Sequence, residues 1–247
     1  MINIIYEDKN LLAVDKPAGI VVFPAAPSGE PRSTSIERES KSKEKTLIDL
    51  LLEIEAGLRK AGKPPRYGIV HRLDKDTSGI LLVAKNSEIL DFLQKQFKNG
   101  EVTKKYLALL VGNLKEDRGT IETLIGRSPK NRKKQKVYLP YEPKAGGKRI
   151  ATTEYKALER YEGYTLAEVR PKTGRKHQIR THLAYLGHPI AGDKVYGFKN
   201  QACPKNLKRQ FLHASDIEIT MPDKKRMEFQ APLPKELKEI LNNLKTK

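Results

Sequence analysis

The apolar residues of this chain fall into short runs whose spacing changes between that of strands and that of helices. Residues 80–84 form a continuous apolar run of strand length, whereas Leu and Ile recur at helical spacing over residues 47–58. Other strand-like runs lie at 11–14, 20–23, 106–111, 164–169 and 216–220. Because no repeat and no regular strand–helix–strand rhythm is present, we expect an α+β fold in one domain over residues 1–247. Its central sheet should be mixed, mainly antiparallel and flanked by helices.

Capping residues mark the ends of the expected helices. Thr46, with Asp49 three residues later, is typical of a helix start. Asn86 or Ser87 can cap a second helix, which Gly100 would close. Two further helical patterns lie at 179–186 and 234–244. We therefore expect four helices beside the strands.

Residues 28–45 differ in composition from the rest of the chain. They contain five Ser, five basic and four acidic residues, and Ile36 is the only aliphatic one. Such a segment buries too little apolar surface to offset the loss of chain entropy on ordering. We therefore expect a mobile insertion loop.

The net charge limits the partners that this chain can have. Its 48 Lys and Arg exceed its 30 Asp and Glu, which gives a formal net charge of +18. Such a surface attracts polyanions, because each neutralised phosphate releases condensed counterions. Anionic membranes would attract it too, but no apolar run approaches the roughly 20 residues needed to span a bilayer. We expect a nucleic acid as the partner and no membrane association.

Cysteine content and the first residues indicate the compartment. Cys203 is the only cysteine, so no intrachain disulfide can form, and a reducing compartment is the natural reading. The chain start lacks a basic segment and meets Glu7 and Asp8 early, which is unlike a signal peptide. We expect a cytoplasmic protein.

Residues 127–149 are the most basic part of the chain, with nine basic residues and Glu142 as the single acid. A mobile arm that grips phosphates and a solvated charged loop are both compatible with this composition. For the first alternative, the candidate contacts are Arg127, Arg132, Lys133, Lys134 and Lys136.

Residues 71–79 read HRLDKDTSG and stand directly before the apolar run 80–84. A charged surface turn that merely caps a strand would have a similar composition. Residues 76–79 also match the short signature around one carboxylate of aspartic proteases, in which two carboxylates share a proton. No second such signature occurs, so that alternative would require a homodimer.

Residues 172–182 combine basic side chains with an expected helix start. Arg175, Lys176 and Arg180, together with the free amides of a helix N-terminus, would form an anion site. His177 and His182 are five residues apart rather than four, and they lack a neighbouring Cys or acidic cluster. We expect these histidines to pack or to touch phosphate, and we expect no metal.

Taken in order, these motifs resemble the RluA-type family of RNA pseudouridine synthases. The resemblance extends from near residue 4 to near residue 244. It rests on Arg72-Leu73-Asp74 with Ser78-Gly79, on Tyr106-Leu107-Ala108-Leu109, on Thr173-Gly174-Arg175 with His177-Gln178-Ile179-Arg180, and on residues 6–8, 16–19 and 187–190.

The resemblance implies a pseudouridine synthase that isomerises uridine in structured RNA, either ribosomal or transfer RNA. It implies one catalytic domain with a central cleft, no cofactor and no metal, and we expect a monomer. Many relatives carry a small RNA-binding domain ahead of the catalytic one. Here the first motif begins at residue 4, so we expect no such accessory domain.

The resemblance also implies roles for single residues. Asp74 would be the catalytic carboxylate, either abstracting a ribose proton to give a glycal or attacking the sugar directly. Arg180 or Arg175 would hold that carboxylate ionised, and we favour Arg180. Tyr106 would stack on the uracil and help to remove the proton from carbon 5, although an ordinary core aromatic would fit the same position.

Two further groups would contact the RNA. Arg72 would fill the space left by the extruded nucleotide, and extrusion is needed because a stacked base hides its sugar. His71 and His177 would touch the RNA nearby. The main alternative is a catalytically idle RNA-binding or assembly factor. Intact Asp74, Tyr106 and Arg180 favour the enzyme over that alternative.

Overall fold

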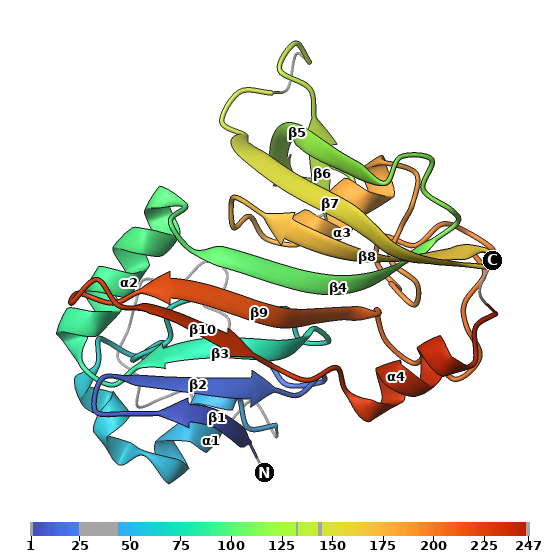
Figure 1. Cartoon of the computed structure of the whole chain (residues 1–247). Coiled ribbons are helices and arrows are strands. Elements are labelled where there is room, and N and C mark those ends of the chain that lie inside the picture. Colours follow the sequence, from blue (N-terminus) through green and yellow to red (C-terminus); the bar gives the residue numbers. More distant parts are fainter. Residues whose placement is uncertain (1, 25–43, 132, 143–144, 246–247) are drawn as a thin grey trace. The chain divides into compact units, whose positions relative to one another are not determined.

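The computed structural model describes residues 2–24, 44–131, 133–142 and 145–245, and the chain folds into two compact units (Figure 1). Unit 1 comprises Met1–Glu101 and Ile219–Ala231, and unit 2 comprises Val102–Glu218 and Pro232–Lys247. Nearly all of the expected insertion at 28–45 lies outside the described residues, and so does Arg132. Within the described ranges, no helix is both long and apolar enough to cross a membrane.

Unit 1 is built on three antiparallel strands in the order β1-β2-β3. Their bounds are Asn3–Glu7 for β1, Leu11–Lys16 for β2 and Ser78–Ala84 for β3, and the unit also contains β10, Arg226–Gln230. All seven residues of β3 are buried, which explains its unbroken apolar sequence. The strand predicted at 80–84 is therefore confirmed.

Two helices of unit 1 begin where their capping residues predict. In α1, Leu47–Ile54, the Asp49 carboxylate accepts hydrogen bonds from the Thr46 amide at 2.9 Å and the Thr46 hydroxyl at 2.7 Å. In α2, Ser87–Asn99, the Asn86 side chain caps the first turn, and Gly100 adopts the left-handed conformation that ends the helix. The helical pattern after α1 continues as a 3-10 helix, Ala56–Lys60, rather than as one long helix.

The strand predicted at 20–23 is wrong. Val22 and Phe23 form bends, and the carbonyls of Val21 and Val22 accept hydrogen bonds from the amides of Leu47 and Ile48 at 2.8 and 3.1 Å. Free amides at a helix start need acceptors. The apolar segment therefore completes the first turn of α1 instead of pairing in the sheet.

Unit 2 contains antiparallel strands in the order β9-β4-β8-β7-β5-β6. Their bounds are Thr103–Val111 for β4, Arg118–Arg127 for β5, Gln135–Tyr138 for β6, Arg149–Tyr161 for β7, Tyr164–Pro171 for β8 and Leu212–Thr220 for β9. Helix α3, Gln178–Tyr185, packs on β6, β7 and β8. Helix α4, Lys235–Asn242, closes the chain. The predicted α+β fold with a mainly antiparallel sheet is confirmed.

The core of unit 2 is one cluster of buried side chains that come from several elements. Leu109 and Leu110 of β4, Leu183 of α3 and Phe211 ahead of β9 are all fully buried in one cluster. β5 and β7 alternate between buried and exposed residues, and sequence analysis did not predict them because half of their residues are polar. The basic stretch at 127–149 begins at the last residue of β5, contains β6 and ends at the first residue of β7.

Candidate functional site

Asp74 lies in unit 1 on the turn that precedes β3. It is half-buried, and its carbonyl accepts a hydrogen bond from the Thr77 amide at 3.1 Å. The next residue, Lys75, offers its carbonyl to the Gly19 amide at 2.9 Å. The turn that carries Asp74 is therefore attached to the turn that follows β2.

A buried cation strengthens this attachment. Lys16, at the end of β2, is fully buried, and its Nζ donates to the carbonyls of Pro17, Ile20 and Lys75 at 2.7, 3.0 and 3.1 Å. Burial of an ammonium group is costly unless its protons are accepted. Sequence analysis assigned no role to Lys16, and its only signal was a lysine that follows an apolar strand and precedes Pro17.

His71 makes contacts inside unit 1. Its Nε2 accepts a hydrogen bond from the Leu82 amide at 3.1 Å, and its ring stacks on Phe97 of α2 with the centroids 4.7 Å apart. These contacts tie the start of the Asp74 turn to β3 and α2. They account for His71 structurally, and its expected contact with RNA stays a prediction.

Arg72 is exposed and stacks on a buried aromatic ring. Its Cζ lies 5.1 Å from the ring centroid of Phe23, and the Cζ of Arg66 lies 4.8 Å from the same ring. A guanidinium over an aromatic face gains electrostatic attraction from the ring. Two cations are thus held at the surface of unit 1. One of them, Arg72, stands two residues before Asp74 in the sequence.

Tyr106 lies on β4 in unit 2, next to an irregularity of the sheet. Lys105 pairs with Asp216 of β9 and Tyr106 with Ala214, so Ser215 is an extra residue that forms a bulge. Bulges re-aim neighbouring side chains and are frequent next to active sites. Tyr106 is half-buried at the edge of the unit 2 core, which fits both a site residue and a packing residue.

Arg180 of α3 forms a buried ion pair within unit 2. Its Nε and Nη2 donate to Oδ2 and Oδ1 of Asp193 at 2.7 and 2.8 Å. The Asp193 carboxylate is fully buried, and the Arg180 side chain is 7% exposed. Burial by itself would raise the pKa of Asp193, but the hydrogen bonds and charge of Arg180 hold that pKa below its usual value.

Asp193 is a buried charged residue to which the sequence motifs assigned no role. It ends the turn-rich segment 187–193, in which the sequence shows no obvious chemistry. Its partner lies 13 residues earlier in the chain, on α3. Only the packing of this turn against α3 brings the two side chains together.

Tyr196 joins the ion pair to its surroundings. Its ring centroid lies 5.1 Å from the Cζ of Arg180, and its hydroxyl is 2.9 Å from Nδ1 of His177. The same hydroxyl accepts a hydrogen bond from the amide of Gln135, the first residue of β6, at 2.8 Å. His177 precedes α3 with a φ of 55°. It packs edge-on against Tyr196, and its expected contact with RNA stays a prediction.

Arg175 is hydrogen-bonded to the main chain of β7. Its Nε donates to the carbonyl of Ile150 at 2.8 Å. Burial, together with the charge of neighbouring Arg149, lowers the pKa of Arg175. Arg180 and Arg175 are the two arginines expected to partner Asp74, and of these Arg180 is the one that pairs with a carboxylate within unit 2.

His182 is part of the scaffold of α3. It is fully buried, with Nδ1 2.9 Å from the Thr153 hydroxyl and Nε2 3.0 Å from the Thr123 hydroxyl. Burial lowers the pKa of His182 to about 4, so the ring is neutral at pH 7. In the part of the chain that the structure describes, no three His, Cys, Asp or Glu side chains gather as metal ligands would.

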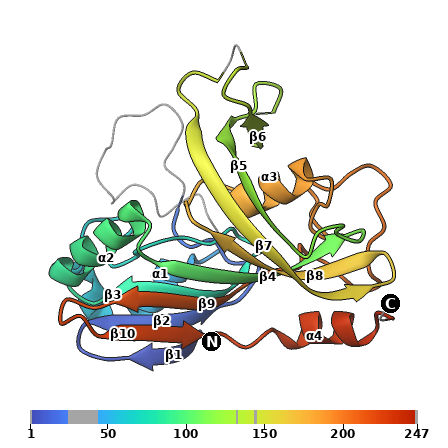
Figure 2. The ribbon, with the colours of Figure 1, turned by 45° about the horizontal axis from the view of Figure 1, so that its top comes forward.

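The basic candidates between residues 127 and 136 that the structure describes lie on the β5–β6 hairpin, whose strands reach beyond α3 in unit 2 (Figure 2). Arg127 ends β5, and Lys133 is exposed near the tip. The Nζ of Lys134 lies 6.0 Å from the ring centroid of Tyr196, whereas the Nζ of Lys136 pairs with Glu142 at 3.3 Å. The hairpin therefore presents cations in a defined arrangement on a structured element.

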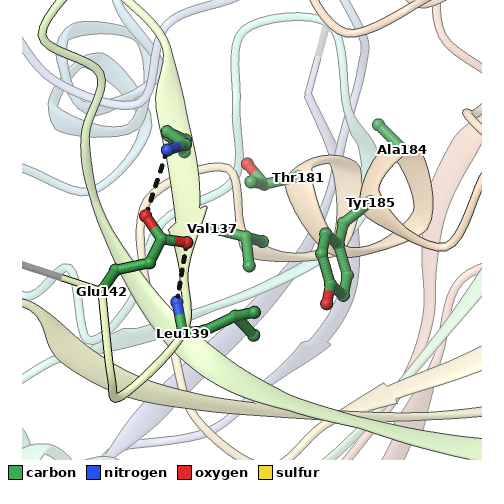
Figure 3. Close-up of a pocket in the computed structure, with 7 residues that line it drawn as sticks. Val137, Leu139, Glu142, Thr181, Ala184 and Tyr185 are labelled. Atoms are coloured by element: carbon green, nitrogen blue, oxygen red, sulfur yellow. Dashed lines mark hydrogen bonds and ion pairs between the residues drawn. The ribbon is translucent and has the colours of Figure 1, made fainter. Parts of the chain in front are cut away.

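An open pocket of about 330 Å³ lies between this hairpin and α3 (Figure 3). Glu142 lies on the β6 side and accepts a hydrogen bond from the Leu139 amide at 3.1 Å, which holds the pKa of this carboxyl below its usual value. Tyr185 of α3 is 52% exposed at the pocket. The lining residues are Lys136, Val137, Leu139, Glu142, Thr181, Ala184 and Tyr185. The pocket thus combines an apolar wall, one aromatic ring and a charged rim.

An antiparallel α+β chain with a carboxylate on a fixed turn, a buried arginine and a cationic hairpin has the features of an enzyme that acts on nucleic acid. The family model described as RNA pseudouridylate synthase matches residues 10–185. The chain therefore belongs to the RNA pseudouridylate synthase family, and the RluA-type resemblance is confirmed. This membership does not favour the aspartic protease alternative.

Curated relatives cover most of the chain. An uncharacterized RNA pseudouridine synthase of Bacillus subtilis is 38% identical over 99% of this chain and 73% of that protein. An uncharacterized RNA pseudouridine synthase of Aquifex aeolicus is 43% identical over 83% of this chain and 59% of that protein. The ribosomal large subunit pseudouridine synthase D of Nitrosomonas europaea is 37% identical over 99% of this chain and 65% of that protein. This chain thus spans between 59% and 73% of the length of these relatives.

Among solved structures, human RNA pseudouridylate synthase domain containing 1 matches with a TM-score of 0.72 and 26% identity. The match covers 94% of this chain and 83% of the human one. The fold described here is therefore that of a pseudouridylate synthase domain.

Proposed function

We propose that this chain isomerises uridine to pseudouridine in RNA, with Asp74 as the catalytic carboxylate. The observation that carries the proposal is the family match over residues 10–185, which contains Asp74, Tyr106 and Arg180 together. The names of several relatives refer to the ribosomal large subunit, and this favours ribosomal RNA over transfer RNA as the substrate. We further propose that the protein acts in the cytoplasm as a monomer.

The proposed reaction is balanced without any cofactor. The bond between ribose carbon 1 and uracil nitrogen 1 breaks, the base turns, and a new bond forms between the sugar and carbon 5. Carbon 5 loses a proton and nitrogen 1 gains one, so substrate and product are isomers. Asp74 acts at the sugar, either by abstracting a ribose proton or by attacking the ring.

Arg180 is the proposed partner that keeps Asp74 ionised. A nearby cation favours the charged form of a carboxylate. Two observations support Arg180 over Arg175: its guanidinium is buried, and a second carboxylate fixes its orientation. The Nε of Arg175 is instead used by the carbonyl of Ile150.

Tyr106 and Arg72 are proposed to handle the base. The bulge beside Tyr106 supports a ring that stacks on the uracil. Arg72 is exposed on the ring of Phe23, which suits a side chain that enters the space of an extruded nucleotide. Extrusion costs a few kcal/mol for unstacking, and phosphate contacts of a strongly cationic protein offset this cost.

The β5–β6 hairpin and the pocket beside α3 are proposed to bind RNA outside the reaction centre. Lys133, Lys134 and Lys136 would contact phosphates. Tyr185 would stack on an unpaired base, and stacking of this kind contributes about 1–3 kcal/mol per base. The exposed ring at an apolar wall with a cationic rim supports this assignment.

Asp74→Asn tests the proposal. The variant should lose turnover by more than about a thousandfold and bind RNA as the wild type does, since affinity comes from many distributed cations. Turnover is measured as tritium released from uridine labelled at carbon 5, and affinity by filter binding. Carbodiimide primer extension on RNA from cells with and without the gene identifies the modified uridine. Activity of Asp74→Asn within about tenfold of wild type would exclude Asp74 as the catalytic group.

A further inference from the structure

The ion pair between Arg180 and Asp193 is unusual because both side chains are almost completely buried, with 7% and 0% of their surfaces exposed. Two charges lose their hydration when they are buried, and their attraction often fails to offset that loss. Apolar residues of similar size would stabilise an interior about as well. Stability alone therefore does not explain this pair.

The Asp193 carboxylate is oriented by its own main chain. Its Oδ1 accepts hydrogen bonds from the amides of Val195 at 2.8 Å and Tyr196 at 3.0 Å. The Asp193 carbonyl in turn accepts from the Gly197 amide at 2.9 Å. The carboxylate is thus fixed by the turn at residues 193–197 independently of Arg180, and it presents a rigid pair of acceptors to the guanidinium.

Tyr196 fixes the guanidinium on its flat face. The ring is 9% exposed, its centroid lies 5.1 Å from Cζ of Arg180, and its hydroxyl is bonded on two sides, to the Gln135 amide and to Nδ1 of His177. A planar bidentate pair defines the plane of the guanidinium, and a ring against its face limits movement perpendicular to that plane.

The side of the guanidinium that Asp193 engages is also informative. Arginine has five N–H groups, and Asp193 uses the one on Nε and one on Nη2. Asp193 thus holds Arg180 through the side of the guanidinium that carries Nε and Nη2.

We infer that Asp193 is a positioning residue for the isomerisation, which fixes the guanidinium of Arg180 against the ring of Tyr196. This inference rests on the proposed function, in which Arg180 keeps Asp74 ionised. Asp193 itself touches neither substrate nor reacting atoms. Its effect on the reaction passes through Arg180.

Asp193→Glu and Asp193→Asn test this inference in the full-length protein. Asp193→Glu keeps the charge of the pair but moves the carboxylate by one methylene, which displaces the guanidinium. The single-turnover rate on saturating RNA should fall about 10- to 100-fold, because small misplacements of a catalytic group have effects of this size. The dissociation constant for RNA should stay within about threefold of wild type, since Asp193 does not touch the substrate and affinity comes from many distributed cations.

The control is Glu236→Gln, which breaks the pair of Arg209 and Glu236, 2.9 Å apart in the same unit. It should leave the single-turnover rate unchanged. Arg180→Lys with and without Asp193→Glu provides a second readout. Because both residues act through one guanidinium, the double variant should be no slower than Arg180→Lys alone.

Each outcome decides between positioning and support of the fold. If Asp193→Glu lowers the melting temperature but keeps the wild-type rate well below that temperature, Asp193 only stabilises the fold and the inference is overturned. The same holds if the rate losses of Arg180→Lys and Asp193→Glu multiply. If Asp193→Asn does not fold, Asp193→Glu and the double variant still decide. An active Asp74→Asn protein in the same assay would refute the proposed function instead, so the two failures are distinguishable.

Discussion

The turn that carries Asp74 and the helix that carries Arg180 are held in place by different kinds of contact. The Asp74 turn is held through main-chain carbonyls, which accept hydrogen bonds from the buried Lys16 ammonium. The Arg180 helix is held through side chains, namely the carboxylate of Asp193 and the imidazole of His182. Carbonyls do not titrate, whereas carboxylates and imidazoles do. The two regions should therefore respond differently to mutation and to pH.

The largest effect is expected for Lys16→Met. The substitution keeps the length of the side chain but leaves the carbonyls of Pro17, Ile20 and Lys75 without this donor. An unsatisfied buried polar group costs about 1–3 kcal/mol, so the free energy of unfolding should fall by roughly 4 kcal/mol. Urea denaturation measures this loss.

Lys85→Met is the matched control in the same unit. Lys85 is 18% exposed and pairs with Glu7 and Glu55 near the surface at 2.8 and 3.1 Å. Its replacement should cost at most about 1 kcal/mol, as is usual for such pairs. Equal losses for the two variants would contradict the special role assigned to Lys16.

A smaller effect is expected from acid on the helix that carries Arg180. The pKa of His182 in the folded protein is about 4, below its ordinary value of about 6.5 in an unfolded chain. The unfolded state therefore binds more protons between these two values, and stability should fall as the pH drops from 6.5 to 4. The loss from this group is on the order of 3 kcal/mol.

His182→Gln isolates this contribution from that of the carboxylates. Glutamine can bond the hydroxyls of Thr123 and Thr153 but does not titrate. The difference in unfolding free energy between wild type and variant should therefore change with pH between 6.5 and 4. A constant difference over this range would mean that His182 carries its proton in the folded state as readily as in the unfolded one.

The smallest effect is expected at the part of unit 2 that is proposed to bind RNA. Replacing Lys133, Lys134 and Lys136 with Gln removes three proposed phosphate contacts, so the log–log salt slope of binding should fall by roughly 2–3 units. Tyr185→Ala should weaken binding by about 1–3 kcal/mol with an unchanged slope, because stacking releases no counterions. Filter binding at several salt concentrations measures both. Identical slopes for the wild type and the triple variant would assign the hairpin cations to a solvated loop.

Local patterns predicted much of the secondary structure. Asn86 and Gly100 mark the two ends of α2, and Thr46 with Asp49 marks the start of α1. These signals are reliable because the hydrogen bonds connect residues within one turn of helix. The error at residues 20–23 has the opposite cause. Those residues are apolar like a strand, but their carbonyls are used by a helix that begins more than twenty residues later.

The site was predicted less completely than the fold. Asp74, Tyr106 and Arg180 stand in recognisable motifs, and the order of these motifs is sufficient to indicate the family. Lys16 and Asp193 were missed because their chemistry depends on partners in other segments. A lone lysine or aspartate beside a turn has no local signal that distinguishes a buried contact from an exposed one.

The sequence by itself determined the apolar run of β3, the caps of the helices, the excess of positive charge and the ordered motifs of the family. Each of these is a property of neighbouring residues or of composition. The tertiary structure alone decided that Asp193 holds Arg180 and that Lys16 holds the Asp74 turn. The reason is that a hydrogen bond acts over about 3 Å, and only packing brings groups from distant segments within that distance.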